Sequence, residues 1–259
     1  MSLMKQVQQA RNSQRPSALA YINLLVTDFI ELHGDRRFAD DPAVVAGIGM
    51  FEGRCVTVLA LEKGVDNADR LRRNFGSAQP EGYRKTLYHM RQAEKFRRPI
   101  LCLIDTAGAA CGIGAEERGQ GQAIAENLFE MMGLTVPVIS IIIGEGGSGG
   151  ALALACANRV YMLENAIYSV LSPEGAASII YKDAGKVEEA CEALKLTAQD
   201  MLRFGVIEGI LKEGQDMVLA PSNIKTAFQE ALKEFRGMKA AQIQEQRYAR
   251  FRKLGGIFS

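Results

Sequence analysis

Five glycines occupy the seven positions from Gly144 to Gly150, directly after an apolar run at 136–143. Glycine lacks the Cβ that obstructs close backbone approach, and it adopts positive φ without strain. Small and apolar residues follow from Ala151 and predict a helix, whose first N–H groups lack partners and carry the positive end of its dipole. The segment therefore predicts a strand-to-helix turn where the backbone meets permanent or developing negative charge.

A second glycine-containing turn spans 107–114 and follows the apolar run at 99–105. In an open α/β sheet, the turns at the carboxyl ends of the strands line the ligand crevice. Two turns of this kind can direct N–H groups at one oxygen and so form an oxyanion hole. The alternative, that both clusters only permit tight packing of helices on strands, stays open from sequence alone.

Strand and helix patterns alternate along the chain, which favours an α/β fold with a largely parallel sheet. We expect a polar N-terminal segment at 1–20 and a single domain over 21–259, with a helical tail from about 221. A serine followed by proline at 172–173 predicts a helix start. The expected helices are 21–32, 83–96, 115–132 and 149–157, and the expected strands are 43–51, 54–62, 99–105, 137–143, 159–163 and 167–171, the first two strands forming a hairpin.

Composition excludes several classes of protein. The net charge is +1, which gives no support to nucleic acid as the main partner. The five cysteines lack the spacing of zinc ligands, so we expect no metal in this chain. No apolar run has the length of a membrane span. An odd cysteine count without a signal peptide is typical of a reducing compartment, and we expect a cytoplasmic protein.

Gly144, Gly146 and Gly149 also satisfy the dinucleotide-binding pattern G-x-G-x-x-G after a strand. Only nine residues separate Gly149 from Arg159, so the crossover helix is short. The cluster also lies in the middle of the chain, after strands that a dinucleotide-binding domain would not place first. Both facts count against this interpretation.

Ser148 lies in a G-x-S-x-G pattern, which is typical of a serine nucleophile in hydrolases. The histidine of such a triad follows the serine in the chain, whereas His33 and His89 both precede Ser148. The hydrolase interpretation therefore fails. Glu116 and Glu117 are candidates for general acid–base catalysis, as in hydration of an enoyl thioester. Acidic residues in the first turn of a helix also stabilise its dipole, which is the stronger explanation.

Several long motifs, in one order, resemble the carboxyltransferase α subunit of bacterial acetyl-CoA carboxylase. The resemblance extends from about Tyr21 to about Ile210. It is carried by the glycine cluster, by YSV at 168–170, and by ELHGDR at 31–36, RRNFG at 72–76, PEGYRK at 80–85, GIGAEERGQ at 112–120 and SPEGAA at 172–177. Such a set is far more specific than any one glycine pattern.

The resemblance implies a crotonase-like fold, a spiral of β-β-α units with C-terminal helices. It implies an enzyme of two α and two β subunits that moves a carboxyl group from carboxybiotin, held on a separate biotin carboxyl carrier protein, to acetyl-CoA. The product, malonyl-CoA, feeds fatty-acid synthesis. Zinc is expected in the β subunit. The resemblance also implies that biotin carboxylase belongs to the wider complex and that ATP is used there. No phosphate-binding loop is visible in this sequence.

By the same resemblance, the N–H groups of Gly146 and Gly147 would hold the biotin-side oxygen, with Gly112 and Ile113 as the facing pair. Further residues would line the biotin or substrate site: Gly108, Ala109, Gly114, Gly144, Ser148 and Gly149. A basic cluster would contact CoA phosphates or the carrier protein, unless it is a solvated face or a subunit contact: Arg72, Arg73, Arg84 and Lys85.

One loop departs from the family. Where the family usually reads Pro-Gly-Ala-Tyr-Pro, residues 107–111 read Ala-Gly-Ala-Ala-Cys. Loss of two prolines increases the freedom of the loop, and loss of the ring removes an apolar wall. Two alternatives to a carboxyltransferase subunit stay open. One is a stand-alone crotonase-type hydratase or decarboxylase acting on an acyl-CoA. The other is a subunit whose altered loop has lost catalytic activity.

Overall fold

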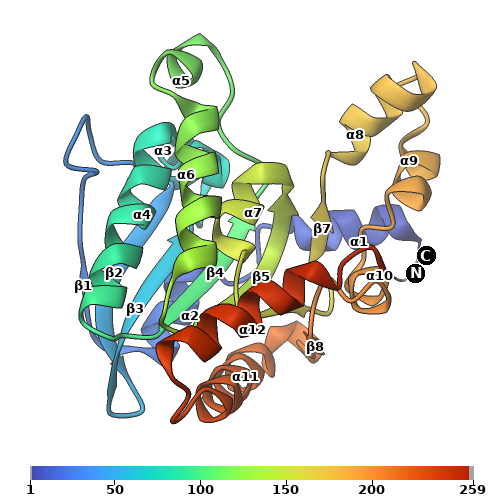
Figure 1. Ribbon diagram of the computed structural model, residues 1–259. Helices are drawn as coiled ribbons and strands as arrows, with labels where there is room; N and C mark the ends of the chain where they lie inside the picture. Colours follow the sequence, from blue (N-terminus) through green and yellow to red (C-terminus); the bar gives the residue numbers. More distant parts are fainter. Residues whose placement is uncertain (1, 257–259) are drawn as a thin grey trace.

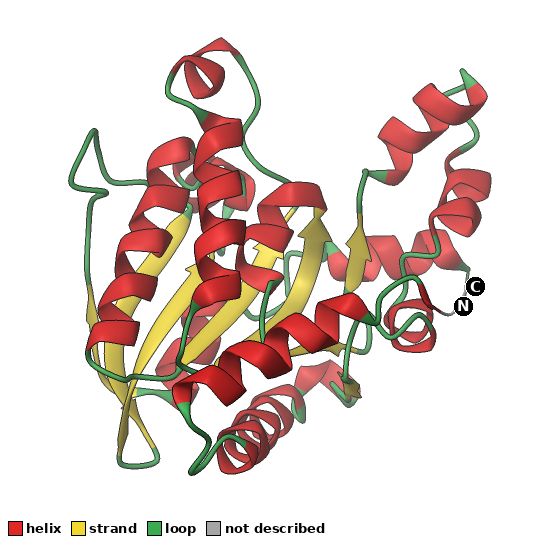
Figure 2. Ribbon diagram, in the orientation of Figure 1, coloured by secondary structure: helices red, strands yellow, loops and turns green. Residues whose placement is uncertain are grey.

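The computed structural model describes residues 2–256 and contains one twisted sheet with helices on both faces (Figures 1 and 2). The strand order is β1-β2-β3-β4-β5-β6-β8, and β7 pairs with β5 beyond this path. The strands are β1 (Thr27–Glu31), β2 (Val44–Phe51), β3 (Arg54–Leu61), β4 (Ile100–Thr106), β5 (Val138–Gly147), β6 (Arg159–Leu163), β7 (Ile167–Ser169) and β8 (Gly209–Leu211).

The sheet is antiparallel at one edge and parallel elsewhere. Strands β1, β2 and β3 pair antiparallel, and the predicted hairpin turns at Glu52-Gly53. From β3 onward each pair is parallel. Every residue of β4 is buried, as are the residues of β5 up to Gly146. Such uninterrupted burial is expected of parallel strands covered on both faces.

The helices form two layers around this sheet. In Figure 1, α4, α6 and α7 cover one face, while α2 lies behind the sheet, where it contacts α11. The helical segments are α1 (Leu3–Ala10), α2 (Ala18–Leu25), α3 (Asn67–Arg72), η1 (Asn74–Gly76), α4 (Pro80–Lys95), α5 (Ile113–Glu117), α6 (Gln120–Gly133), α7 (Ser148–Ala155), α8 (Pro173–Ala176), η2 (Ala177–Tyr181), α9 (Val187–Leu194), α10 (Ala198–Arg203), η3 (Gln215–Met217), α11 (Ala220–Glu234) and α12 (Ala240–Arg252).

The predicted helix at 21–32 is wrong in its second half. Helix α2 starts earlier, at Ala18, because the Ser17 side chain accepts a hydrogen bond from the N–H of Ala20 and caps it. The helix ends at Leu25, and Thr27–Glu31 forms strand β1 along the edge of β2. Pairing with β2 therefore overrides the helical spacing of apolar residues that the sequence shows.

Several further boundaries differ from the prediction, among them the end of β7, which stops at Ser169 and not at 171. The helix expected over 115–132 is two helices, α5 and α6, divided at Gly119, which has a φ of 81°. The strand expected to end at 143 continues through the glycine cluster to Gly147, because β7 pairs with its last three residues. The Ser172 side chain caps α8, as its position before Pro173 predicts.

The polar segment at 1–20 packs against the body of the protein. Val7 and Ala10 of α1 are buried in a small cluster with Ile167 and other residues near α9. The Arg15 guanidinium donates a 2.6 Å hydrogen bond to the carbonyl oxygen of Ile143 in β5. The division of the chain at residue 20 stays a prediction, while in space this segment supports the strand that carries the glycines.

Arg247 binds the C-terminal helix to the segments that precede β5 and β6. It is fully buried, and its guanidinium donates to the carbonyl oxygens of Leu134 and Val136 at 2.6 and 2.9 Å and to Asn158 Oδ1 at 2.6 Å. Burial lowers the pKa of Arg247 to about 10, so the group is still charged at neutral pH.

We predict that Arg247→Met lowers the free energy of unfolding by roughly 3 kcal/mol, because three buried acceptors lose their donor. Arg252, exposed on the same helix, provides the control, and Arg252→Met is expected to change stability by less than about 0.5 kcal/mol. Urea unfolding of both variants measures the difference. Equal stability of the two would contradict the role given to Arg247.

Candidate functional site

The two glycine-containing turns lie against each other at the carboxyl ends of β4 and β5. A Cβ added to Gly147 would stand 2.1 Å from the carbonyl oxygen of Ala107. A Cβ added to Gly150 would stand 2.5 Å from the nitrogen of Ala109. Real Cβ atoms do not approach so closely, so the contact between the turns requires glycine at both positions.

Helix α7 begins at this contact. Its N-cap is Gly147, and no side chain caps the first turn. The first N–H groups of α7 therefore have no side-chain partner, and they lie at the positive end of the helix dipole. Ser148 takes a φ of 49°, a left-handed conformation that costs a non-glycine residue about 1–3 kcal/mol. The geometry suits a group that carries negative charge.

A cleft of about 380 Å³ opens at the start of α7. Ser148 and Gly149 form its polar end, and the remaining lining is largely apolar. It consists of Leu152, Tyr168, Ser169, Val170, Leu194, Met201 and Val206. Apolar walls strengthen the interaction between amide dipoles and a charge held at the polar end.

The predicted donors Gly146 and Gly147 lie at the end of β5. Gly146 stands between two neighbours in the sheet, Thr106 of β4 and Tyr168 of β7, and Gly147 is paired with Ser169. Pairing in the sheet competes for their N–H groups. Gly144 packs against Asp105, whose Oδ1 would lie 2.5 Å from an added Cβ. The roles assigned to these glycines from sequence stay predictions.

The predicted facing pair, Gly112 and Ile113, begins helix α5. The Ile113 side chain is 79% exposed, and a Cβ added to Gly112 would meet no atom within 4 Å. Gly114 lies beside the Arg118 side chain, and Glu116 and Glu117 are exposed. The turn that contacts Gly147 and Gly150 is instead formed by residues 107–109. The facing role of Gly112 and Ile113 stays a prediction.

Three of the predicted basic residues are paired within the protein. Arg72 and Arg73 both bind Asp69, at 2.6 and 3.0 Å. Arg84 binds the buried carboxylate of Asp35 at 2.7 Å. Arg73 and Arg84 are thus largely buried in these pairs, whereas the Arg72 side chain is 57% exposed, and contact of the three with CoA or the carrier protein stays a prediction.

Lys85 is fully buried in α4, where its ammonium group donates to Asp40 Oδ1 at 2.7 Å and to the Val44 carbonyl oxygen at 2.8 Å. Burial raises the pKa of Asp40, but the hydrogen bonds from Lys85, Gly34 and His33 outweigh it, and the pKa falls to about 2. The buried position of Lys85 indicates a structural role inside α4.

Three charged residues that sequence analysis missed lie at the carboxyl ends of neighbouring parallel strands. Lys63 lies two residues after β3, Asp105 is the last residue but one of β4, and Glu145 is two residues before the end of β5. The Lys63 ammonium group is 3.6 Å from Asp105 Oδ1 and pairs with Glu145, whose N–H donates to Asp105 Oδ1 at 2.9 Å. The available signal was one polar residue at the end of each apolar strand.

The pKa values of these groups follow from burial and pairing. Burial raises the pKa of Asp105, against the opposing effect of Lys63. For Glu145, Lys63 and Arg11 outweigh burial and lower the pKa. For Lys63, the two carboxylates outweigh burial and raise the pKa. Glu145 and Lys63 therefore form a buried ion pair directly beside the glycines.

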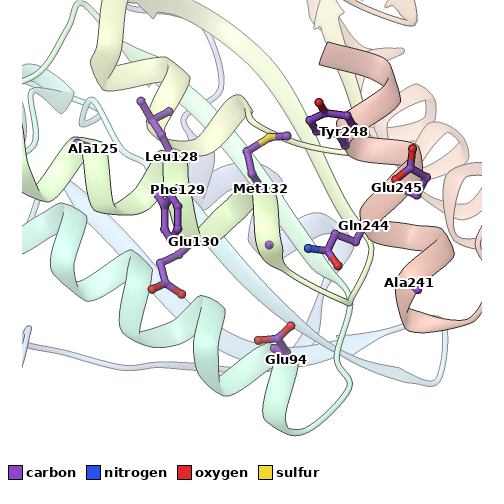
Figure 3. Close-up of a pocket in the computed structure, with 11 residues that line it drawn as sticks. Glu94, Ala125, Leu128, Phe129, Glu130, Met132, Ala241, Gln244, Glu245 and Tyr248 are labelled. Atoms are coloured by element: carbon purple, nitrogen blue, oxygen red, sulfur yellow. The ribbon is translucent and has the colours of Figure 1, made fainter. Parts of the chain in front are cut away.

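A second cleft, of about 1000 Å³, separates α6 from α12 (Figure 3). Phe129 and Tyr248 project from the two helices, and Glu94, Glu130 and Glu245 are the charged residues along it. None of the residues predicted for catalysis lines this cleft. The cleft at the start of α7 is therefore the candidate active site.

Within residues 2–256, no group of three or more histidine, cysteine or acidic residues is arranged to hold a metal ion. In the same described part of the chain, no helix combines the length and apolar character needed to span a bilayer.

Solved carboxylases and decarboxylases share this fold. Transcarboxylase 12S superposes with a TM-score of 0.72 at 20% identity, over 88% of this chain and 44% of that one. A chain of a Pseudomonas malonate decarboxylase hetero-tetramer in complex with coenzyme A superposes with a TM-score of 0.70 at 20% identity, over 88% of this chain and 91% of that one. The predicted crotonase-like fold is confirmed.

The particular family is shown by the sequence comparisons. The family model described as acetyl co-enzyme A carboxylase carboxyltransferase-like matches residues 1–255, and the chain belongs to this family. The carboxyl transferase α subunit of Ruminiclostridium cellulolyticum is 55% identical over 258 residues, covering 99% of each chain. That of Clostridium perfringens is 53% identical over 250 residues, covering 95% of this chain and 92% of the relative.

We predict that Gly147→Ala lowers the free energy of unfolding by about 1–3 kcal/mol, because its Cβ would overlap the Ala107 carbonyl group. Gly121 in α6 has nothing within 4 Å of an added Cβ. Gly121→Ala is therefore expected to stabilise the protein by about 0.5–1 kcal/mol. Denaturant unfolding compares the two, and a neutral Gly147→Ala would contradict the tight crossing.

His89 produces a separate pH dependence. Its ring is buried, and burial, followed by the charges of Lys85, Arg36 and Arg98, lowers the pKa to about 4. The unfolded chain takes up the proton near pH 6.5, before the folded protein does. Stability is therefore expected to fall as the pH drops from 6.5 to 4, by up to about 3 kcal/mol.

Unfolding of wild type and His89→Asn across that pH range measures this effect. The variant should lose that part of the slope, and parallel curves would contradict the assignment.

Within the described residues, neither His33 nor His89 hydrogen-bonds Ser148, so the structure offers Ser148 no histidine base. The Nδ1 atom of His33 instead lies 2.8 Å from Asp40 Oδ2.

Proposed function

We propose that this chain is the α subunit of an acetyl-CoA carboxylase carboxyltransferase and that, with a β subunit, it transfers the carboxyl group of carboxybiotin to acetyl-CoA. The observation that carries the proposal is the contact between the turn at Gly147–Gly150 and the turn at 107–109, beside a cleft, in a chain that matches the family over residues 1–255.

The residues present suit the biotin side of this reaction. Carboxybiotin, when bound, supplies the carboxyl group. The first-turn N–H groups of α7, at Ser148 and Gly149, would neutralise the charge that develops on the ureido oxygen as the carboxyl group leaves. Removal of one donor of this kind typically costs about 2.7–4 kcal/mol. The apolar wall of the cleft would exclude water from the reacting carboxyl group.

The wider assembly follows from the same family. We place the acetyl-CoA site at the junction with the β subunit, which would carry the zinc, and we assign delivery of carboxybiotin to a biotin carboxyl carrier protein. ATP would be used by the biotin carboxylase component. The chain would act in the cytoplasm, in fatty-acid synthesis.

Transfer from malonyl-CoA to free biotin, the reverse reaction, tests the proposal. We expect activity from the chain combined with its β subunit and none from either alone. Gly147→Val in the complex should lower the rate at least about a hundredfold, because its side chain would overlap the Ala107 carbonyl group and displace the first-turn N–H groups of α7, while Gly121→Ala should leave the rate unchanged.

Three results would contradict this assignment. Decarboxylation of malonyl-CoA, or hydration of an enoyl-CoA, by the isolated chain would favour a stand-alone crotonase-type enzyme. An inactive complex would favour a subunit without catalytic activity. A fully active Gly147→Val complex would remove the glycine turn from the mechanism.

A further inference from the structure

Residues 170–194 form a helical arm that projects from the sheet, with α8, η2 and α9 along it (Figure 1). Val170, Ile179 and Ile180 are 77%, 68% and 56% exposed. Among the elements that contact the arm is α1, which contacts α9. Residues of α9 pack on α1 in the buried cluster that contains Val7, Ala10 and Cys191, so α1 holds the outer part of the arm, and the contacts near the root hold the segment that leaves the sheet.

The root of the arm is part of the candidate site. Strand β7 pairs with the glycine end of β5, matching Gly146 with Tyr168 and Gly147 with Ser169. A small cavity lies where the arm leaves the sheet, and both sides contribute to it. It is lined by Arg11, Ala107, Glu145, Gly146, Gly147, Ile167, Ser169, Leu171, Ser172 and Pro173. A change in the arm's position would alter this wall and the neighbouring cleft.

Arg11 joins the two sides. It follows α1, and its Nε donates to Glu145 Oε1 at 2.6 Å. The other end of the same guanidinium donates to both oxygens of Glu174, at 2.6 and 3.3 Å. Glu145 belongs to the glycine strand, and Glu174 belongs to α8 in the arm. A planar guanidinium can hold two carboxylates at fixed positions, which a lysine ammonium group does less well.

The charges alternate from the sheet to the arm, in the order Asp105, Lys63, Glu145, Arg11 and Glu174. The inner part is buried, so its geometry is fixed by the cost of leaving a buried charge unpaired. The outer part is accessible, since the Glu174 side chain is 47% exposed. Removal of Glu174 therefore releases the root of the arm at α8 from Arg11 without leaving a buried charge unpaired, while α9 stays packed on α1.

We propose that Arg11 is a positioning residue of the carboxyltransferase site, which holds the arm against the glycine strand through Glu174 and Glu145. This inference rests on the proposed function for its effect on catalysis. The attachment of the arm rests on the contacts alone. Arg11 does not touch the reacting atoms in this scheme; it fixes the wall beside them.

The test compares Glu174→Ala and Arg11→Lys with a matched control, Glu52→Ala. Glu52 and Lys225 form a 2.5 Å ion pair with side chains 48% and 45% exposed, between the β2–β3 hairpin and α11. That pair resembles the Arg11–Glu174 pair in exposure but lies outside the candidate site. Arg11→Lys keeps a cation beside Glu145 and loses the two-sided contact.

Two measurements are made on each variant. Trypsin cleavage of the full-length chain after Lys182 and Lys186, both exposed in the arm, reports detachment. Carboxyl transfer from malonyl-CoA to biotin, in the complex with the β subunit, reports positioning. We expect several-fold faster cleavage, and kcat/KM for biotin lower by about tenfold, with KM for malonyl-CoA and the unfolding midpoint unchanged. The double variant, with both Arg11→Lys and Glu174→Ala, should show effects no larger than those of either single variant, because both substitutions remove the same contact between Arg11 and Glu174.

Unchanged cleavage in Glu174→Ala would overturn the attachment, and faster cleavage with unchanged kcat/KM would overturn the positioning role. Equal effects of Glu52→Ala on cleavage and on kcat/KM would also overturn the positioning role, because they would show that loss of an ion pair outside the site has the same result. A wild-type complex that transfers no carboxyl group would contradict the proposed function instead, while the cleavage result would still decide whether Arg11 holds the arm.

Discussion

The site depends on the close crossing of two backbone turns at one edge of the sheet. At Gly147 and Gly150 the turn after β5 approaches residues 107–109 more closely than any Cβ would allow. This approach fixes where α7 begins and therefore where its free N–H groups point. The cleft and the strained backbone of Ser148 lie at that start, and β7 pairs with the last three residues of β5 beside it.

Buried ion pairs lie beside the crossing of the two turns and stabilise it. Parallel strands align their carboxyl ends, so residues at or near the ends of β3, β4 and β5 meet. Here these are Lys63, Asp105 and Glu145, which satisfy one another in a region where an unpaired charge would be costly. Arg11 extends the same set of contacts to the arm, so the N-terminal segment contacts the strand that carries the glycines although it lies far away in sequence.

Much of this fold could be predicted from local sequence. The ends of strands β4 and β6 were predicted to within one residue, because continuous apolar runs are typical of buried parallel strands. Strand β1 was missed because its spacing of apolar residues also fits a helix, and only pairing with β2 decides between the two. The end of β5 was misplaced for the same kind of reason: β7 extends the strand into glycines that would otherwise form a turn.

The sequence by itself determined the family and the α/β architecture, and it predicted a backbone site for negative charge, because motifs, apolar runs and glycine clusters act over short stretches of chain. Only the tertiary structure decided which residues face the glycines. It showed residues 107–109 against α7, Lys85 inside the core and Arg11 between Glu145 and Glu174. These are contacts between distant segments, fixed by the order and register of the strands, and no local pattern encodes them.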